Sequence, residues 1–259
     1  FSEAQGLATQ AAAVAVFAGA TASTIETGQS FRSLSLCASG LLDGANETLI
    51  VDGTLIRLGA SASGTTSGAI SGSGLAWVLT VTPASGTSGA SLGASASLTL
   101  TSAGANATGL SSSALASLIN ALSYQNTSSD NPSAGSRSFA LTQAQDTGGT
   151  ADGGSDTTAL NLTSTISVVP VNDGPLLGSL AAINLIDTAA QDSFSSSSAA
   201  LLASDLEGQS LTYGLSGGVS TAASFDGISY DLAATGSYGM LYLNSSTGQY
   251  RFQPKSDWK

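Results

Sequence analysis

Carboxylate and amide side chains are grouped at three places in the sequence, and such groups offer the oxygen ligands that calcium prefers. They are Asp146, Asp152 and Asp156 in DTGGTADGGSD, Asn172 and Asp173 in VVPVNDGP, and Asp205 and Glu207 in ASDLEGQS. Ca²⁺ takes about six to eight oxygens, chiefly from carboxylates and carbonyls on turns that can wrap the ion. Asp and Asn also favour turns for their own backbone hydrogen bonds. Each group is therefore either a calcium site or an ordinary set of turn residues.

The residue types needed for common enzymatic chemistry are scarce. The chain contains no histidine, which removes the most frequent general base, the Ser-His-Asp triad and the usual zinc ligand. Its one cysteine, Cys37, can form neither an internal disulfide nor a thiolate metal site. Serines are abundant, but no base is available to activate one. We therefore expect that the protein is not an enzyme.

Charge and composition narrow the class of protein further. The 259 residues include 6 Lys and Arg against 17 Asp and Glu, a net charge of −11. Binding to nucleic acid or to an anionic membrane surface would need a basic face, and no apolar run reaches membrane-spanning length. Only 9% of residues are charged, against about 25% in ordinary domains. Abundant Ser, Thr and Gly beside alternating apolar residues indicate an all-β extracellular protein.

The periodicity of apolar residues predicts the elements that must position the acidic groups. In the first part, alternation predicts strands at 33–36, 48–58, 76–82, 97–101, 136–145 and 157–171. Asp52-Gly53 interrupts the second run and predicts a hairpin turn. Residues 112–122 have helical spacing instead, with Ser112 or Ser113 as a cap. The Ser- and Gly-rich stretches 59–74, 84–96 and 146–156 are expected to be loops.

A break near Pro170 and Pro175 divides the chain. Beyond it we expect strands at 180–186, 211–215 and 228–232, then a hairpin at 238–251. The predicted organisation is a lead-in segment 1–13, a first domain 14–171, a linker 172–175 and a second domain 176–259. The predicted fold is all-β, two tandem antiparallel β-sandwiches with one short helix in the first.

Several segments resemble repeat modules of giant bacterial surface adhesins. VVPVNDGP resembles the linker that ends cadherin-like domains, and LLASDLEGQSLTYGLSGG resembles the start of the next module. GSYGMLYLNSSTGQYRFQP is similar to the terminal hairpin of VCBS repeats. TIETGQSF, LLDGANETLIVDGT, INALSYQNTSSDNPSAGSRSFALT and DTGGTADGGSDT look like pieces of the long repeats that precede such linkers. The resemblance covers nearly the whole chain.

The resemblance implies calcium at the domain junction. It assigns Asn172, Asp173, Asp205 and Glu207 as ligands, with Glu26 as a carboxylate from the first domain. Cadherin-like linkers carry a further Asp before the Asn-Asp pair, where this chain has Pro170 or Val171, so one ion is expected. The implied protein is a structural, adhesive segment of a secreted or cell-surface bacterial protein, and its partners are neighbouring repeats.

Two other functions remain open. The chain could be a subunit of an extracellular filament or surface layer, with identical subunits joined by a strand donated from residues 11–17, notably Val14, Val16 and Phe17. It could also be a carbohydrate-binding module for surface glycans. The candidate aromatic platforms are Trp77, Tyr213, Tyr230, Tyr238, Tyr242 and Tyr250.

Overall fold

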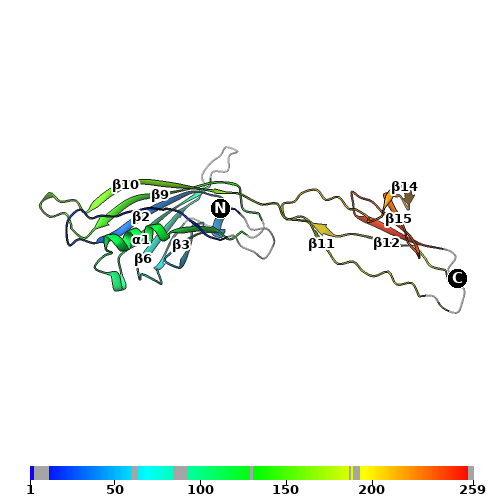
Figure 1. Ribbon diagram of the computed structural model, residues 1–259, viewed down its shortest axis with the longest axis horizontal. Helices are drawn as coiled ribbons and strands as arrows, with labels where there is room; N and C mark the ends of the chain where they lie inside the picture. Colours follow the sequence, from blue (N-terminus) through cyan, green and yellow to red (C-terminus); the bar gives the residue numbers. More distant parts are fainter. Residues whose placement is uncertain are drawn as a thin grey trace. The chain divides into compact units, whose positions relative to one another are not determined.

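The computed structural model describes residues 1–2, 12–59, 64–83, 93–128, 131–186, 188 and 193–255. Within these residues the chain forms antiparallel sheets and one α-helix, so the predicted all-β class with a short helix in the first part is confirmed (Figure 1). The chain divides into two compact units, Phe1–Asn172 (unit 1) and Asp173–Lys259 (unit 2). No helix in the described part is long and apolar enough to cross a membrane.

Unit 1 contains two antiparallel sheets. The larger has the strand order β10-β9-β2-β7-β6-β5 and the smaller the order β1-β8-β3-β4. The larger comprises β2 (Phe31–Leu41), β5 (Gly64–Ala69), β6 (Ala76–Thr82), β7 (Ala94–Thr101), β9 (Gly135–Asp146) and β10 (Thr157–Val168). The smaller comprises β1 (Val14–Ala15), β3 (Glu47–Val51), β4 (Thr54–Arg57) and β8 (Ser123–Asn126). Short 3-10 turns lie at Gly44–Asn46, Gly104–Asn106 and Ala151–Gly153.

The core of unit 1 follows from the two-residue period of its strands. Successive side chains of a strand point to opposite faces of the sheet, so alternate residues of β2 and β7 are buried. Leu34, Leu36 and Leu98 are almost fully buried on the inner face of the large sheet, and Leu49 and Val51 on that of the small sheet. Burial of these side chains is the main stabilising term of the unit.

Helix α1 (Ser112–Ala121) completes the layer formed by the small sheet. Its buried face carries Leu115, Leu118 and Ile119, the helical spacing expected from the sequence. The helix starts at Ser111, whose side chain accepts a hydrogen bond from the backbone N–H of Ala114 at 3.2 Å. The predicted caps, at the next two residues, were therefore wrong by one or two positions.

The turn and loop predictions had mixed outcomes in unit 1. The hairpin at Asp52-Gly53 is confirmed, because β3 and β4 pair on either side of it and both turn residues have positive φ, 45° and 78°. The expected loop 59–74 is wrong at 64–69, where β5 pairs with β6. Most of the expected loop 84–96 lies outside the described residues.

Unit 2 has one five-stranded antiparallel sheet and one two-stranded ladder. The sheet has the order β12-β17-β16-β15-β14 and the ladder joins β11 to β13. The ladder comprises β11 (Leu176–Leu177) and β13 (Ala203–Ser204), and the sheet comprises β12 (Ser197–Ala200), β14 (Val219–Phe225), β15 (Ile228–Thr235), β16 (Gly239–Leu243) and β17 (Gln249–Pro254). The predicted strand at 228–232 and the terminal hairpin are confirmed.

Two predicted strands of unit 2 are wrong. Residues 180–186 form no strand and leave Leu180, Ile183 and Ile186 exposed by 54%, 38% and 77%. Residues 211–215 form no strand either, although the backbone N–H of Tyr213 donates to the carbonyl of Ser245 at 2.8 Å. Apolar residues in a row satisfied the sequence pattern, but a strand also needs a neighbouring strand with which to pair.

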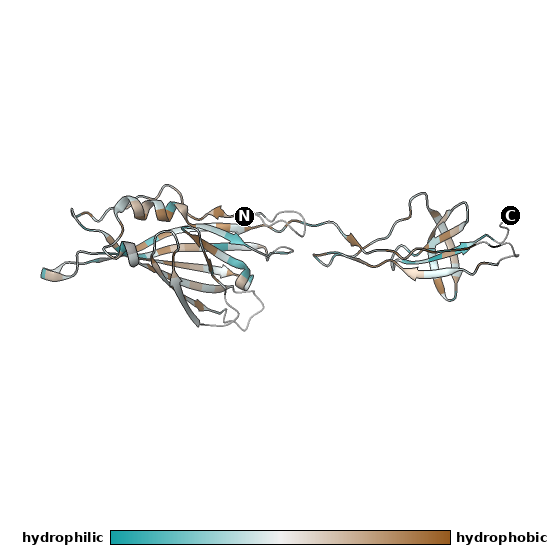
Figure 2. Cartoon of the chain, turned by 90° about the horizontal axis from the view of Figure 1, so that it is seen from below, coloured by the Kyte–Doolittle hydropathy of each residue, from teal (hydrophilic) through white to brown (hydrophobic). Residues whose placement is uncertain are grey.

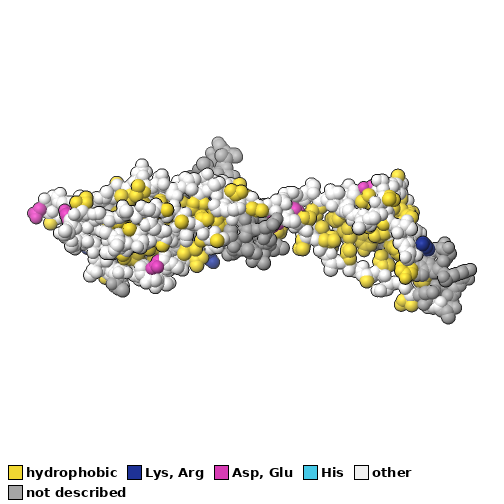
Figure 3. All heavy atoms as spheres, viewed as in Figure 1, with side chains coloured by type: hydrophobic (Ala, Val, Ile, Leu, Met, Phe, Trp, Pro, Cys, Tyr) yellow, Lys and Arg dark blue, Asp and Glu magenta, His cyan; other side chains and the backbone are white. Residues whose placement is uncertain are grey.

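The core of unit 2 is small. Among its described residues the fully buried apolar side chains are those of Tyr230, Ala233 and Leu243. Tyr230 and Tyr242 pack with Phe225, with ring centroids 4.9 to 6.2 Å apart. Pale and brown colours dominate its strands in Figure 2, and apolar side chains gather on its visible surface in Figure 3. Among the described residues, unit 2 thus buries far fewer apolar side chains than unit 1.

Candidate metal centre and buried polar network

The ladder at the start of unit 2 brings two of the predicted ligand segments together. Leu176 pairs with Ser204 and Leu177 with Ala203, and the backbone N–H of Gly178 donates to the carbonyl of Leu202 at 2.7 Å. The ladder thus joins the chain just after Asp173 to the segment that leads into the turn carrying Glu207.

Both acidic side chains at these positions are withdrawn from solvent. Asp173 is only 4% exposed. The two carboxylate oxygens of Glu207 are buried and accept no hydrogen bond from the described residues. An ionised carboxylate that is buried without a partner is costly. A bound cation would remove that cost, so the chemistry of Glu207 fits a divalent ion coordinated by oxygen.

The other predicted ligands of this group have different roles. Asp205 lies in a turn whose backbone closes from the N–H of Gly208 to the Asp205 carbonyl at 3.2 Å, and its Oδ1 accepts from the N–H of Gln209 at 2.9 Å. Asp205 therefore shapes the turn that presents Glu207. Asn172 is the last residue of unit 1 and precedes Asp173 directly.

The described residues contain no group of three or more His, Cys, Asp or Glu side chains that could together hold a metal ion. The four predicted ligands are thus not gathered into one multi-carboxylate cage. A site built on Asp173 and Glu207 would take its remaining oxygens from backbone carbonyls, an amide or water, which calcium accepts.

Glu26 lies elsewhere, and its assignment to the junction was wrong. It precedes β2, accepts a hydrogen bond from Nε2 of Gln29, and lines a cavity together with Asp146 and Asp156. Asp156 directly precedes β10, so Glu26 lies near the start of that strand. The chain leaves for residue 172 from the other end of this twelve-residue strand, about 35 Å away at the usual rise per residue.

The acidic loop is organised by its own hydrogen bonds. Asp146 Oδ1 accepts from the N–H of Gly148 at 2.8 Å, an Asx turn. Asp156 accepts from the side chains of Gln145 at 3.0 Å and Thr157 at 2.9 Å, and these bonds lower the pKa of its carboxyl group. Asp152 is exposed in the 3-10 turn with φ of 53°. The turn interpretation accounts for all three residues.

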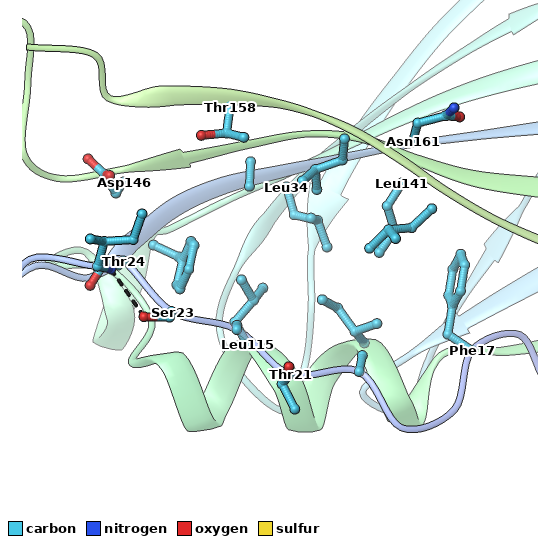
Figure 4. A pocket seen from close by; sticks show the side chains of 18 of the residues that line it. Phe17, Thr21, Ser23, Thr24, Leu34, Leu115, Leu141, Asp146, Thr158 and Asn161 are labelled. Atoms are coloured by element: carbon cyan, nitrogen blue, oxygen red, sulfur yellow. Dashed lines mark hydrogen bonds between the residues drawn. The ribbon is translucent and has the colours of Figure 1, made fainter.

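The cavity beside Glu26 has a volume of about 760 Å³. Figure 4 shows Phe17, Leu115 and Leu141 directed into the space between residues 17–26, α1 and the paired strands β9 and β10. The walls are apolar in the middle, and the acidic side chains Asp146 and Asp156 lie at one end.

A buried polar network in unit 1 was not predicted. Arg137 on β9 and Glu47 on β3 are both fully buried, and Nε of Arg137 donates to Oε1 of Glu47 at 2.5 Å. Nη2 of Arg137 donates to Oδ2 of Asp43 at 2.9 Å and to the carbonyl of Ser133 at 3.0 Å. The hydroxyl of Tyr124 donates to Oε1 of Glu47 at 2.8 Å. One cation, two carboxylates and a phenol are thus joined inside the unit, with Nη1 of Arg137 left without a hydrogen-bond partner among the described residues.

The environment of the network shifts two pKa values. Burial, reinforced by the charge of Glu47, raises the pKa of the Tyr124 phenol far above its ordinary value. Burial acts to lower the pKa of Arg137, but the hydrogen bond and the charge of Glu47 outweigh it, so that pKa is raised. Tyr124 therefore stays neutral and Arg137 stays charged, which suits a structural network rather than proton transfer.

The residues proposed for the other functions are placed as follows. Val14 lies in β1, which pairs with β8 of its own sheet, Val16 is 3% exposed, and Phe17 packs against the same core. Of the predicted strand 11–17, only Val14 and Ala15 form a strand. Residue 11 lies outside the described part. Segment 14–17 thus belongs to the fold of unit 1 and is not available for donation without opening it.

The aromatic residues do not form an open platform. Trp77 is partly buried against the core of unit 1, and Tyr230 is buried in the aromatic cluster of unit 2, whereas Tyr238 is 64% exposed. Tyr213 packs against Gly248, and Tyr250 lies half-buried in β17. Stacking of a sugar requires an exposed ring face, which the buried members of this set lack.

Comparison with protein-family models, with curated proteins and with solved structures finds no match to this chain.

Proposed function

We propose that this chain is a structural, adhesive segment of a large secreted or cell-surface protein, and that unit 2 binds Ca²⁺ at Asp173 and Glu207. The observation that carries the proposal is the carboxylate of Glu207, whose two oxygens are buried without a hydrogen-bond partner. Asp173, which lies just before the segment that pairs with β13, is also buried. Two buried carboxylates on adjacent segments repel each other unless a cation lies between them.

The structural role is supported by the division into two β units and by the motif at their boundary. The VVPVNDGP segment resembles cadherin-like linkers, and the boundary between the units falls between Asn172 and Asp173. Unit 2 has a small apolar core, so a ligand that binds only its folded form would contribute a large share of its stability. Calcium outside the cell is abundant enough for weak sites to be filled.

The ligand set has a defined composition. Asp173 and Glu207 supply the charge, and the turn that starts at Asp205 positions Glu207. Backbone carbonyls of unit 2 and water would supply the further oxygens. Calcium bound there would hold the start of unit 2 against the turn that follows β13.

Thermal unfolding in calcium and in chelator tests the proposal. We expect millimolar Ca²⁺ to stabilise unit 2 by about 1 kcal/mol, given the affinities of roughly 10⁻⁴ to 10⁻³ M that are typical of extracellular modules. Mg²⁺ at the same concentration should stabilise it much less, because Mg²⁺ demands a tighter octahedral shell. Identical unfolding of unit 2 in calcium and in chelator would contradict the proposal.

A further inference from the structure

β10 is an edge strand of the large sheet in unit 1, and neither charge nor proline protects it against pairing. Its sequence, TTALNLTSTISV, has twelve residues without a charge, a proline or a glycine. Edge strands of soluble proteins are commonly protected by charged residues, proline or short length, because their free backbone groups can pair with another chain. An uncharged edge of this length is notable in a chain of net charge −11.

Two features limit the open part of this edge. At its end, the amino group of Phe1 donates to the carbonyl of Ser167 and the N–H of Val169 donates to the carbonyl of Phe1, both at 3.0 Å. Nearer its start, the pairing with β9 shifts register between Ala159 and Leu162, a β-bulge. The regular stretch without a described partner on its outer side is therefore 162–166.

The hydrogen-bonding direction within this stretch follows from the contact with Phe1. In a strand, the backbone groups of alternate residues point to the same side. The carbonyl of Ser167 and the N–H of Val169 point outward, away from β9. By the same alternation, the backbone groups of Thr163 and Thr165 point outward and have no described strand beside them.

One apolar side chain of this stretch is exposed to solvent on the face that is directed at the core. Leu162 and Ile166 are four residues apart on the face that is directed at the core. Ile166 is 6% exposed, whereas Leu162 is 56% exposed at the wall of the 760 Å³ cavity. An apolar side chain of an added strand would remove Leu162 from water, which is favourable.

We propose that two copies of this chain pair through β10 in antiparallel orientation, with Ser164 opposite Ser164 of the second copy. The open stretch has Ser164 at its centre, so a twofold axis there pairs Thr163 with Thr165 of the second copy and Leu162 with Ile166 of the second copy. Each Thr163–Thr165 pair exchanges two backbone hydrogen bonds, and each exposed leucine gains an apolar cross-strand neighbour.

Charge favours the antiparallel over the parallel arrangement of the two copies. The acidic residues Asp146, Asp152 and Asp156 all lie near the start of β10. Antiparallel pairing places the two acidic turns at opposite ends of the joined strands, whereas parallel pairing would bring them together. The contact is short, so the association is weak and should strengthen as salt screens the repulsion between two chains of net charge −11.

Site-directed disulfide formation tests this pairing. Cys37 is the only cysteine, so Ser164→Cys is made together with Cys37→Ser. Opposed residues of a non-hydrogen-bonded pair have Cα atoms about 4.5 Å apart, within the range for a disulfide. We expect mild oxidation to yield at least about fivefold more disulfide-linked dimer than from a control with Ser67→Cys on β5, the opposite edge of the same sheet.

A second variant separates edge pairing from chance collision. Thr163→Pro removes an outward N–H without removing a bond to β9, so the folded monomer should tolerate it. Added to Ser164→Cys, it should reduce the dimer yield to that of the β5 control while the circular dichroism spectrum stays unchanged. Equal yields from Ser164→Cys and Ser67→Cys, or a dimer that persists with proline at position 163, would overturn the proposal.

Discussion

Arg137 and Glu47 form an ion pair whose two side chains are completely buried between the sheets of unit 1, with Nε 2.5 Å from Oε1. Removing one partner of such a pair leaves a buried charge uncompensated, which typically costs about 3–5 kcal/mol. We expect Glu47→Gln to lower the free energy of unfolding of unit 1 by an amount near this range, measured by urea denaturation.

An exposed ion pair provides the control for this prediction. Arg251 and Asp226 also form an ion pair, but the Asp226 side chain is 80% exposed. Asp226→Asn should change the stability of unit 2 by less than about 1 kcal/mol. Comparable losses in the two variants would show that burial does not govern the strength of the pair in unit 1.

The pH dependence of unit 1 should reflect Tyr124. Its pKa in the folded protein lies above the ordinary value near 10. The unfolded chain therefore releases the phenol proton first as the pH rises, and stability that is complete below pH 10 is lost above it. Tyr124→Phe should flatten the loss of stability above pH 10 in alkaline urea titrations. The same change at Tyr238, which is 64% exposed, should leave the profile as it is.

The burial of Arg137 and Glu47 could have been predicted from the alternation of residues in their strands. Arg137 stands two residues before Phe139 and four before Leu141, so the strand alternation that buried these two also buried the arginine. Glu47 has the same relation to Leu49 and Val51. A charge in the apolar phase of a strand was thus visible in the sequence. The partner of each charge was not, because β3 and β9 are separated by more than 80 residues.

Elsewhere the sequence lacked the relevant information. β5 consists of Gly, Thr, Ser and Ala with every side chain exposed, so only its backbone pairing with β6 makes it a strand. Residues 180–186 show the converse case, an apolar run without a paired neighbour. The placement of Glu26 depended on which end of a sandwich its segment reaches, and local sequence does not specify that. Alternation predicted best the strands whose inner faces are buried by a second layer.

The Asp52-Gly53 turn gives a test of local backbone chemistry. Gly53 has φ of 78°, a conformation that side chains with a Cβ disfavour, although a Cβ there would meet no atom within 4 Å. Gly53→Ala should therefore lower the stability of unit 1 by about 1–2 kcal/mol through backbone strain alone. Gly64→Ala is the matched control, because Gly64 is equally open and lacks a positive φ. If both variants unfold at the wild-type urea concentration, the turn does not fix the β3–β4 hairpin.

The calcium proposal makes opposite predictions for one variant under two conditions. In chelator, the carboxylate of Glu207 is buried without a partner, so Glu207→Gln, which removes the charge and keeps the shape, should stabilise unit 2 by about 1 kcal/mol. In millimolar Ca²⁺ the same variant loses a ligand and should lose the stabilisation that calcium gives the wild-type protein, also about 1 kcal/mol.

Asp152→Asn makes the same change of charge at an exposed position of unit 1 and should keep the full calcium response. Calorimetry of the three proteins in both buffers measures all of these differences. A calcium response that survives Glu207→Gln would place the ion elsewhere or nowhere, and an unchanged stability in chelator would show that the buried carboxylate carries no penalty for calcium to relieve.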